Sequence, residues 1–461
     1  MRTKHLLSVG LVLCSASASH SALASGYATA RFGGEHGNPI TTNPTAIYYN
    51  PAGLAESEGI HIFLDANIAF RGASFTHTAV PEDEPEPMGA EGANTDQATL
   101  FNVLAVPMIG ASAKFGDFAI GAGFYVPFGG AAVWDQNERF KDDPKYPGTV
   151  DGAQRWYAIE GSIRTLSFTL AAAYKIPNTG LSLGVSGNLL RSTIQTLRAR
   201  KADGTNDIAE EGRSLVDVGN WAGSFGAGVM FEAMPEKLWF GLSYQSRPNV
   251  AGGMKLDGTL TNYFGGDNAP LNVEVHQDLP DIVRLGARFR ATREVELRLF
   301  GDWTRWSALD NQCLSNEGAP CEVDDKGIST SELADQPVQN LNRDWHDAFG
   351  VRVGGSYWVT PEVELFTGLG YDSNAVPDRT LDPSLTDFHD ISVALGGRFQ
   401  LGDHLHASLS YSHFFYIPRD TSNESGNDDY LPAQAYSRGP DAGGKYTQWV
   451  GAVNVNLEAN F

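Results

Sequence analysis

His406 and Ser408 are the residues of this sequence whose types and spacing come nearest to catalytic chemistry. Two residues apart in a strand, they lie on one face, where an imidazole could activate a hydroxyl for ester hydrolysis. Leu405, Ala407 and Leu409 take the alternate positions, so the pair belongs to the polar face. The sequence has no G-x-S-x-G motif, which would present a serine nucleophile on a strand-to-helix turn. We therefore expect no catalytic residues and no enzymatic activity.

Cys313 and Cys321 are the two cysteines that remain if the first 24 residues are removed. In an oxidising compartment the expected outcome is a disulfide that closes a small loop, and the alternative is two free thiols. Two cysteines do not supply a tetrahedral ligand set, so we expect neither a metal site nor a cofactor.

The last sixteen residues, 446–461, indicate which kind of secondary structure carries these side chains. Apolar residues such as Trp449, Val453 and Leu457 alternate with polar residues such as Asn454 and Asn456. Period two with one apolar face predicts a strand that faces an apolar medium on one side. A transmembrane β-barrel needs such a last strand, because it closes against the first strand and leaves no edge. The final aromatic residue, Phe461, resembles the C-terminal signal that bacterial outer-membrane proteins present to the barrel insertion machinery.

Fourteen segments share this alternation, an even number. They are 59–75, 99–115, 118–127, 160–175, 181–197, 220–234, 237–247, 281–292, 293–307, 346–359, 361–374, 388–401, 404–417 and 446–461. Short turns such as Gly116-Asp117 and Gly402-Asp403 follow every second segment, and long polar loops follow the others. This asymmetry is typical of the outer membrane of Gram-negative-type bacteria, and it places both termini in the periplasm. We predict an all-β, 14-stranded antiparallel transmembrane β-barrel.

The N-terminal region, residues 1–58, does not show this alternation. Arg2 and Lys4 precede the apolar run 6–13, and Ala22-Leu23-Ala24 fits a cleavage site, so residues 1–24 are expected to be a secretory signal peptide. Residues 25–58 are broken by three prolines and many glycines, and they hold too little apolar surface to fold alone. A barrel lumen would shelter this segment, which leaves residues 59–461 for the barrel.

Composition excludes two other classes of protein. No stretch beyond the signal holds 18 uninterrupted apolar residues, so a helical membrane protein is not expected. The formal net charge of −22 would repel nucleic-acid phosphates, so no nucleic-acid partner is expected.

Four stretches together resemble one family, the FadL-type outer-membrane transporters of long-chain fatty acids and other hydrophobic compounds. The stretch TNPTAIYYNPAGLAE (42–56) is similar to the family's N-terminal hatch with its Asn-Pro-Ala motif, here Asn50, Pro51 and Ala52. The stretches 155–176, 279–307 and 368–415 resemble the family's strands. The resemblance implies a barrel plugged by the hatch, passive uptake from outside, and lateral release through a gap in the wall. The implied ligand is a long-chain fatty acid, or alternatively an aromatic hydrocarbon.

The resemblance implies an apolar groove at the extracellular end. Five aromatic residues in and around the loop after the third strand are the expected ligand contacts: Phe124, Phe128, Trp134, Trp156 and Tyr157. A carboxylate headgroup needs a cation, and Arg71, Arg155 and Arg164 are equal candidates.

Some alternatives stay open. A general porin would keep an open aqueous lumen, and an adhesive barrel would take nothing up. The acidic loops 81–96, 308–345 and 418–445 are most simply solvated, although they could bind divalent cations beside lipopolysaccharide. Outer-membrane lipid and lipopolysaccharide are the expected surroundings of the barrel.

Overall fold

The computed structural model describes residues 28–29, 31–81, 83–250, 252–264, 268–321, 339–422 and 439–461. The expected signal peptide, residues 1–24, lies outside the described residues. In the part of the chain that is described, no helix is long and apolar enough to cross a membrane.

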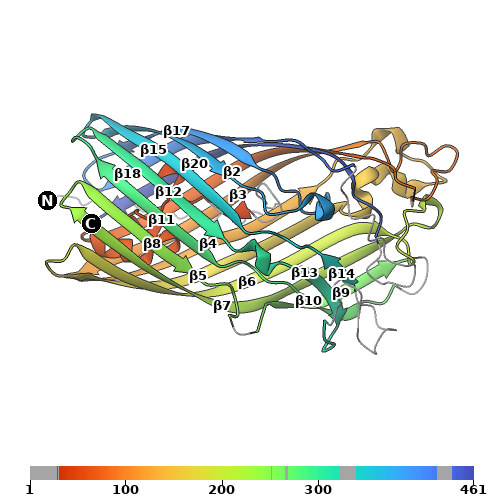
Figure 1. Ribbon diagram of the computed structural model, residues 1–461, viewed down its shortest axis with the longest axis horizontal. Helices are drawn as coiled ribbons and strands as arrows, with labels where there is room; N and C mark the ends of the chain where they lie inside the picture. The colour runs from red at the N-terminus through yellow and green to blue at the C-terminus, as the bar shows by residue number, and fades with distance from the viewer. Residues whose placement is uncertain are drawn as a thin grey trace, which may run out of the picture.

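A closed barrel of fourteen antiparallel strands forms the described structure, as the alternation predicted (Figure 1). Each expected segment coincides with one of these strands. In chain order they are β2 (Ile60–His77), β3 (Gln97–Phe115), β4 (Phe118–Val133), β5 (Glu160–Ile176), β6 (Leu181–Arg200), β7 (Gly212–Met234), β8 (Leu238–Gln245), β11 (Ile282–Arg290), β12 (Val295–Thr304), β15 (Ala348–Thr360), β16 (Val363–Asp372), β17 (Asp390–Gln400), β18 (Leu405–Tyr416) and β20 (Gly444–Asn460).

The first and last strands close the barrel, as expected. β20 pairs with β2 from Asn460↔His61 to Gly444↔His77, and it pairs with β18 on its other edge. Ile60, Ile62 and Leu64, the outward residues at the start of β2, are 43–49% exposed. Its inward residues alternate with them and are mostly polar and buried. An exposed apolar band around a polar interior is stable only where the surroundings are lipid.

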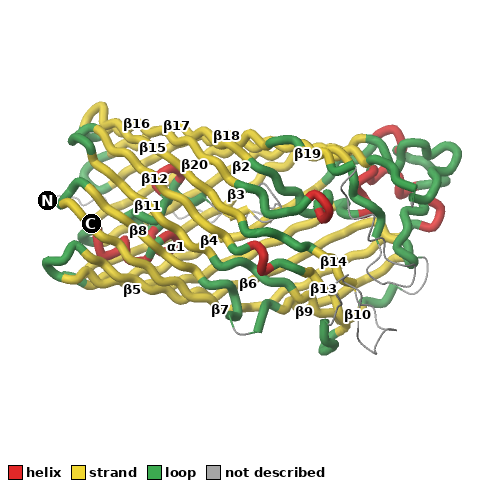
Figure 2. The backbone as a smooth tube through the Cα atoms, in the orientation of Figure 1, coloured by secondary structure: helices red, strands yellow, loops and turns green. Residues whose placement is uncertain are grey.

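The two ends of the barrel differ, and Figure 2 shows the helices and long loops gathered mainly at the end opposite the C-terminus. We call these the turn end and the loop end. At the turn end the connections are short, as predicted, and Gly116 makes the two-residue turn between β3 and β4 with a left-handed φ of 61°. At the loop end lie η3 (Glu138–Phe140), η4 (Pro147–Asp151), η5 (Ala153–Trp156), η6 (Ile208–Glu210), η7 (Trp306–Ala308) and η8 (Asp378–Thr380).

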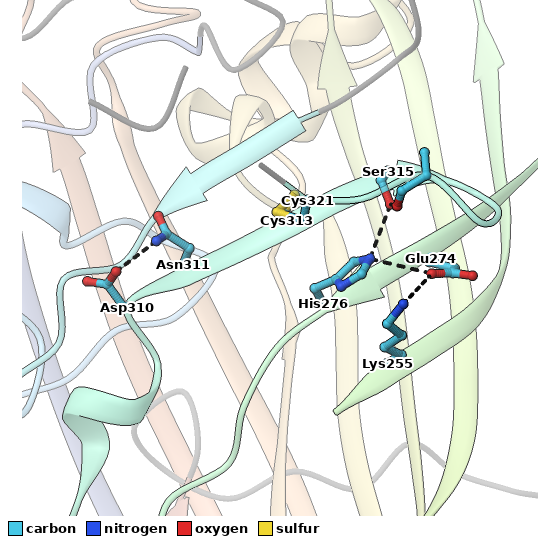
Figure 3. Close-up of a disulfide and its surroundings, with 9 residues drawn as sticks. Lys255, Glu274, His276, Asp310, Asn311, Cys313, Ser315 and Cys321 are labelled. Atoms are coloured by element: carbon cyan, nitrogen blue, oxygen red, sulfur yellow. Dashed lines mark hydrogen bonds and ion pairs between the residues drawn. A yellow bond between two sulfur atoms is a disulfide. The ribbon is translucent and has the colours of Figure 1, made fainter. Parts of the chain in front are cut away.

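Four short strands at the loop end were not predicted from the sequence. β9 (Lys255–Tyr263) pairs with the loop-end part of β7. The sheet then continues in the order β10 (Leu271–His276), β13 (Asn311–Asn316) and β14 (Gln339–Asn342), each strand pairing with the one before it. We call this the loop-end sheet. Their alternation is short and lies in polar surroundings, a pattern that predicts loops. Cys313 and Cys321 form the predicted disulfide at this sheet, beside His276 and Glu274 (Figure 3). A two-residue strand, β19 (Arg419–Asp420), pairs with β20.

Residues 31–58, which we call the N-terminal segment, pack against inward-facing residues of the barrel. The segment contains η1 (Gly34–His36), α1 (Ala46–Tyr49) and η2 (Pro51–Glu56). The Gly33 N–H donates to Asp65 of β2 over 3.0 Å, and Ser243 of β8 donates to the Tyr49 carbonyl over 2.6 Å. The segment thus contacts strands that lie far apart around the wall.

Candidate functional site

A large cluster of apolar side chains fills the loop end of the interior, and we call it the loop-end cluster. It draws residues from β2, β3, β4, β6, β7, β9, β10, β13, β20 and the long loops. Its largest members are Phe75, Phe128, Trp134, Trp306, Trp345, Phe388 and Tyr446. Binding of a hydrocarbon chain to such apolar side chains is favourable, because the contact removes the apolar surfaces of both from water.

Two of the five expected aromatic contacts belong to this cluster, and a third packs against it. Phe128 and Trp134 are 2% and 6% exposed, and the Phe128 ring lies edge-on to Trp306. Tyr157 packs against the cluster, and its ring centroid lies 6.0 Å from that of Phe75. Its hydroxyl donates to the Asp441 carbonyl. The structure thus brings these three side chains together at the loop end, and their role as ligand contacts stays a prediction.

The structure places the other two aromatic residues elsewhere. Phe124 lies on the outer face of β4, half-buried, with its ring centroid 4.9 Å from that of Phe168, a residue that is 46% exposed. Trp156 is buried, but its indole N–H donates to the Asn94 side chain over 2.8 Å. The Arg155 guanidinium covers its ring. Trp156 therefore packs within the long loops and outside the loop-end cluster.

The wall beside the cluster is interrupted between β3 and β4. The two strands pair from Phe115↔Phe118 only as far as Met108↔Tyr125. Pro107 and Pro127 lie directly beyond that last pair, and proline cannot donate to a ladder. On its other edge, β4 shifts register against β5 between Tyr125 and Phe128, which is a β-bulge. Beyond this point β4 diverges from β3.

Contact between β3 and β4 resumes at the loop end, through side chains. Asn102 of β3 donates to the Val133 carbonyl and accepts from the Val133 N–H, each over 3.2 Å. Between these limits β1 (Ala28–Thr29) pairs with Gly129 and Phe128 and takes the place of β3 at the edge of β4. We call the region from Pro107 and Val126 to Asn102 and Val133 the β3–β4 interruption.

The three candidate arginines have different surroundings. Arg155 is fully buried in the loops, and its Nε donates to Glu211 over 2.9 Å. Burial lowers the pKa of Arg155, and the Glu211 carboxylate partly offsets that effect. Arg164 is exposed on β5. Arg71 is buried in the interior and bonds to Gln448, Ala131 and Thr386. These contacts leave Arg71 as the one of the three that faces the interior without a carboxylate partner among the described residues.

A polar cavity of about 60 Å³ lies between the N-terminal segment and the wall. Its lining includes Arg31, Glu35, Asp302, Arg352 and Asn454. One oxygen of Glu35 is buried there without a hydrogen-bond partner among the described residues. The volume and the polar lining suit several water molecules, and a hydrocarbon tail would leave these groups unsatisfied.

The Asn50-Pro51-Ala52 motif fixes the N-terminal segment in place. The Asn50 amide donates to the Pro39 carbonyl over 2.8 Å and to the Val229 carbonyl of β7 over 3.0 Å. Its oxygen accepts from the Ala52 N–H and caps η2, while Pro51 begins that helix with a φ that suits its first turn. One side chain thus joins two parts of the segment to the wall.

Comparison with known proteins identifies the family. Residues 11–447 match the family described as outer membrane protein transport protein (OMPP1/FadL/TodX). The chain belongs to this family. It is therefore an outer membrane transport protein of a family that carries hydrophobic compounds, as the sequence resemblance implied.

Individual proteins that the chain is similar to are distant in sequence. An outer membrane protein of Neisseria meningitidis serogroup B is 22% identical over 457 residues, which cover 91% of this chain and 92% of that protein. The structure of a Pseudomonas aeruginosa FadL homologue has a TM-score of 0.71 at 18% identity and covers 96% of this chain and 100% of its own. The Pseudomonas putida toluene transporter TodX has a TM-score of 0.61 at 13% identity, with coverages of 91% and 95%. At these identities the two structures show the shared fold.

The sequence did not reveal where the ladder between neighbouring strands is interrupted. Pro107 and Pro127 carry the signal, since each falls inside a strand that otherwise reads as regular. Their neighbourhood in space depends on the register between β3 and β4, which the structure supplies.

Proposed function

We propose that this protein takes up long-chain fatty acids or similar hydrophobic molecules passively across the outer membrane. In this proposal the ligand enters from the loop end, moves through the loop-end cluster and leaves sideways through the β3–β4 interruption into lipid. A hydrocarbon tail is poorly soluble in water, so a route that returns it to lipid avoids the cost of hydrating it. The proposal includes no catalytic step.

The observation that carries the proposal is the position of the interruption. Phe128 and Ala132 of β4 belong to the loop-end cluster and also lie within the interruption. An apolar interior thus adjoins a stretch of wall in which β4 lacks its ladder to β3. Elsewhere such an edge would leave unpaired N–H and C=O groups in lipid, which is costly. Here β1 and the Arg71 side chain meet part of that need.

The N-terminal segment is part of the proposal as a plug, the hatch that its motif suggests. The Asn50 bonds and the buried contacts of Ala52 with Met230 and Trp239 support this role. With the plug seated, water and ions have no wide path through the lumen. The proposal also places the turn end and both termini in the periplasm, lipopolysaccharide around the loop end, and Phe461, which is 64% exposed, within reach of the barrel insertion machinery.

A second candidate ligand is an aromatic hydrocarbon. The likeness to the toluene transporter TodX favours it. An apolar cluster that is rich in tryptophan and phenylalanine would accept either kind of ligand.

Uptake and conductance together test the proposal. Cells that produce the protein should take up oleate or toluene faster than cells that lack it. In planar bilayers the intact protein should conduct ions weakly, and deletion of residues 25–58 should raise the conductance strongly. Equal uptake with and without the protein would exclude the transport function. A wide channel that is already open in the intact protein would indicate a general porin.

A further inference from the structure

Arg71 is a buried cation in the wall of the interior. It lies on β2 and is 4% exposed. Its Nε donates to the Gln448 side-chain oxygen over 3.0 Å, its Nη1 to the Ala131 carbonyl over 3.1 Å, and its Nη2 to the Thr386 hydroxyl over 2.9 Å. Each of these acceptors is neutral. Among the described residues, no carboxylate lies within ion-pair distance of Arg71.

Three other inward-facing arginines of the barrel have acidic partners. Arg298 pairs with Glu296 at 3.1 Å, Arg352 with Asp372 at 2.6 Å, and Arg398 with Glu458 at 2.9 Å. Arg284 lies over the Tyr48 ring of the N-terminal segment. A buried charge without a counter-ion is costly, so a protein that keeps one has a use for it or supplies the counter-ion from outside.

A second donor lies beside Arg71 without a partner. Gln448 is 6% exposed, and its side-chain oxygen accepts from both Arg71 and Thr386. This assigns its amide nitrogen to the other side, where that nitrogen is buried without a hydrogen-bond partner among the described residues. The guanidinium of Arg71 and the amide nitrogen of Gln448 therefore lie near each other, and the amide nitrogen is a hydrogen-bond donor that is not used by any described residue. A carboxylate is the ligand group that accepts from both.

Apolar side chains flank this pair of donors. Ala69 and Ala73 are the inward residues on either side of Arg71 along β2. Ala69 belongs to a cluster with Leu104, Phe414 and Val450, whereas Ala73 belongs to the loop-end cluster. Arg71 thus lies where two apolar regions meet, which suits a charged headgroup on a hydrocarbon tail.

Arg71 also contacts the β3–β4 interruption directly. The Ala131 carbonyl to which it donates belongs to the stretch of β4 that has no ladder to β3. The guanidinium therefore lies at the inner mouth of the proposed exit.

We infer that Arg71 and the Gln448 amide form a subsite for the carboxylate of a long-chain fatty acid at the inner mouth of the β3–β4 interruption. The inference rests on the proposed transport function and selects the fatty acid among its ligands. A carboxylate that binds Nη1 competes with the Ala131 carbonyl, so binding loosens the hold of Arg71 on β4 where the wall must open.

Ligands that differ only in the headgroup test the inference on the unaltered protein. The purified barrel should bind oleate about ten- to a hundredfold more tightly than oleyl alcohol, since a hydrogen bond to a charged group contributes roughly 1.5–3 kcal/mol. Equal affinity for the two would overturn the subsite, whereas failure to bind oleate, oleyl alcohol and toluene alike would overturn the proposed transport function.

Variants then locate the effect. Arg71→Met should lower oleate affinity about ten- to a hundredfold and leave oleyl alcohol and toluene within about twofold. Arg71→Lys, which keeps the charge and loses the planar fork, should fall between. Gln448→Met should cost about three- to tenfold for oleate. Arg164→Met removes a positive charge from the outer surface and should have no effect. An equal loss for oleate and oleyl alcohol in Arg71→Met and Arg71→Lys would show that Arg71 only braces β4.

Discussion

Met108 of β3 and Tyr125 of β4 form the last register pair between these two strands on the side of the loop end. Beyond this pair, β3 keeps its full ladder to β2 while β4 keeps its ladder to β5 across a bulge. The interruption thus arises where one strand, β4, changes course, and the remaining strands close the barrel. Single-residue changes in β4 can therefore test the role of the β3–β4 interruption.

Deletion of Pro127 should close the interruption. From Tyr125 to Phe128, β4 advances three residues while β5 advances two, from Ser167 to Thr165. Removing one residue from β4 makes the two strands advance by the same number of residues. β3 can then continue its ladder to β4 in the place that β1 now takes. We expect oleate uptake to fall at least about tenfold while the barrel still shows heat-modifiable migration in gels, because the strands gain backbone bonds.

Pro127→Ala is the matched control for the deletion, since it keeps the residue count and the bulge. It should retain uptake within about threefold. A deletion variant that folds and takes up oleate at the normal rate would rule out release between β3 and β4.

A methyl group at Gly184 should displace the plug. On β6, a Cβ at this position would overlap with the Ala52 backbone nitrogen of the N-terminal segment. Overpacking of this kind costs about 1–3 kcal/mol, and the segment can avoid it by leaving its seat. Gly184→Ala should therefore raise the ion conductance in planar bilayers.

Gly187 on the same strand provides the comparison, because a Cβ there meets nothing within 4 Å. Gly187→Ala should leave the conductance unchanged. If the two variants conduct alike, the N-terminal segment does not limit ion flow.

Alternation predicted the fourteen barrel strands because each of them must present apolar residues to lipid at every second position. The same signal could not place Phe124, since apolar residues surround it on both sides and the bulge that follows changes the face. Nor could it show that Arg155 is neutralised by Glu211, because that partner comes from another loop. Local pattern predicts the wall, and contacts between distant loops decide which side chains remain free for a ligand.

Acidification should weaken the loop-end sheet. Burial, and after it the positive charge of Lys255, lowers the pKa of His276 below its ordinary value of 6.5. The unfolded sheet then binds a proton at a higher pH than the folded sheet does. The stabilisation that neutral His276 gives the folded sheet is therefore complete above pH 6.5. It is lost as the pH falls from there through the pKa of His276 in the folded sheet. Hydrogen exchange of the amides of β10 and β13 should show lower protection at pH 5.5 than at pH 7.5.

His276→Gln isolates the histidine from other groups in the sheet. Burial acts to raise the pKa of Glu274, but the Gly318 N–H and Lys255 lower it on balance, so its own contribution is lost only in more acidic solution. The variant should show no difference in protection between pH 7.5 and pH 5.5. A difference that persists in the variant would assign the pH effect to another group.

Loss of the disulfide should loosen the same sheet without affecting transport. Cys313 and Cys321 are separated by 8 residues, and closing a loop of that size contributes roughly 2–3 kcal/mol in the chain-entropy description. In the double variant Cys313→Ser with Cys321→Ser, protection of the β10–β13 ladder should fall by that amount, because β13 holds Cys313 in register with His276. Oleate uptake should stay within about twofold, since the disulfide lies away from the β3–β4 interruption. A matching loss of uptake would mean that the loop-end sheet shapes the entrance for the ligand.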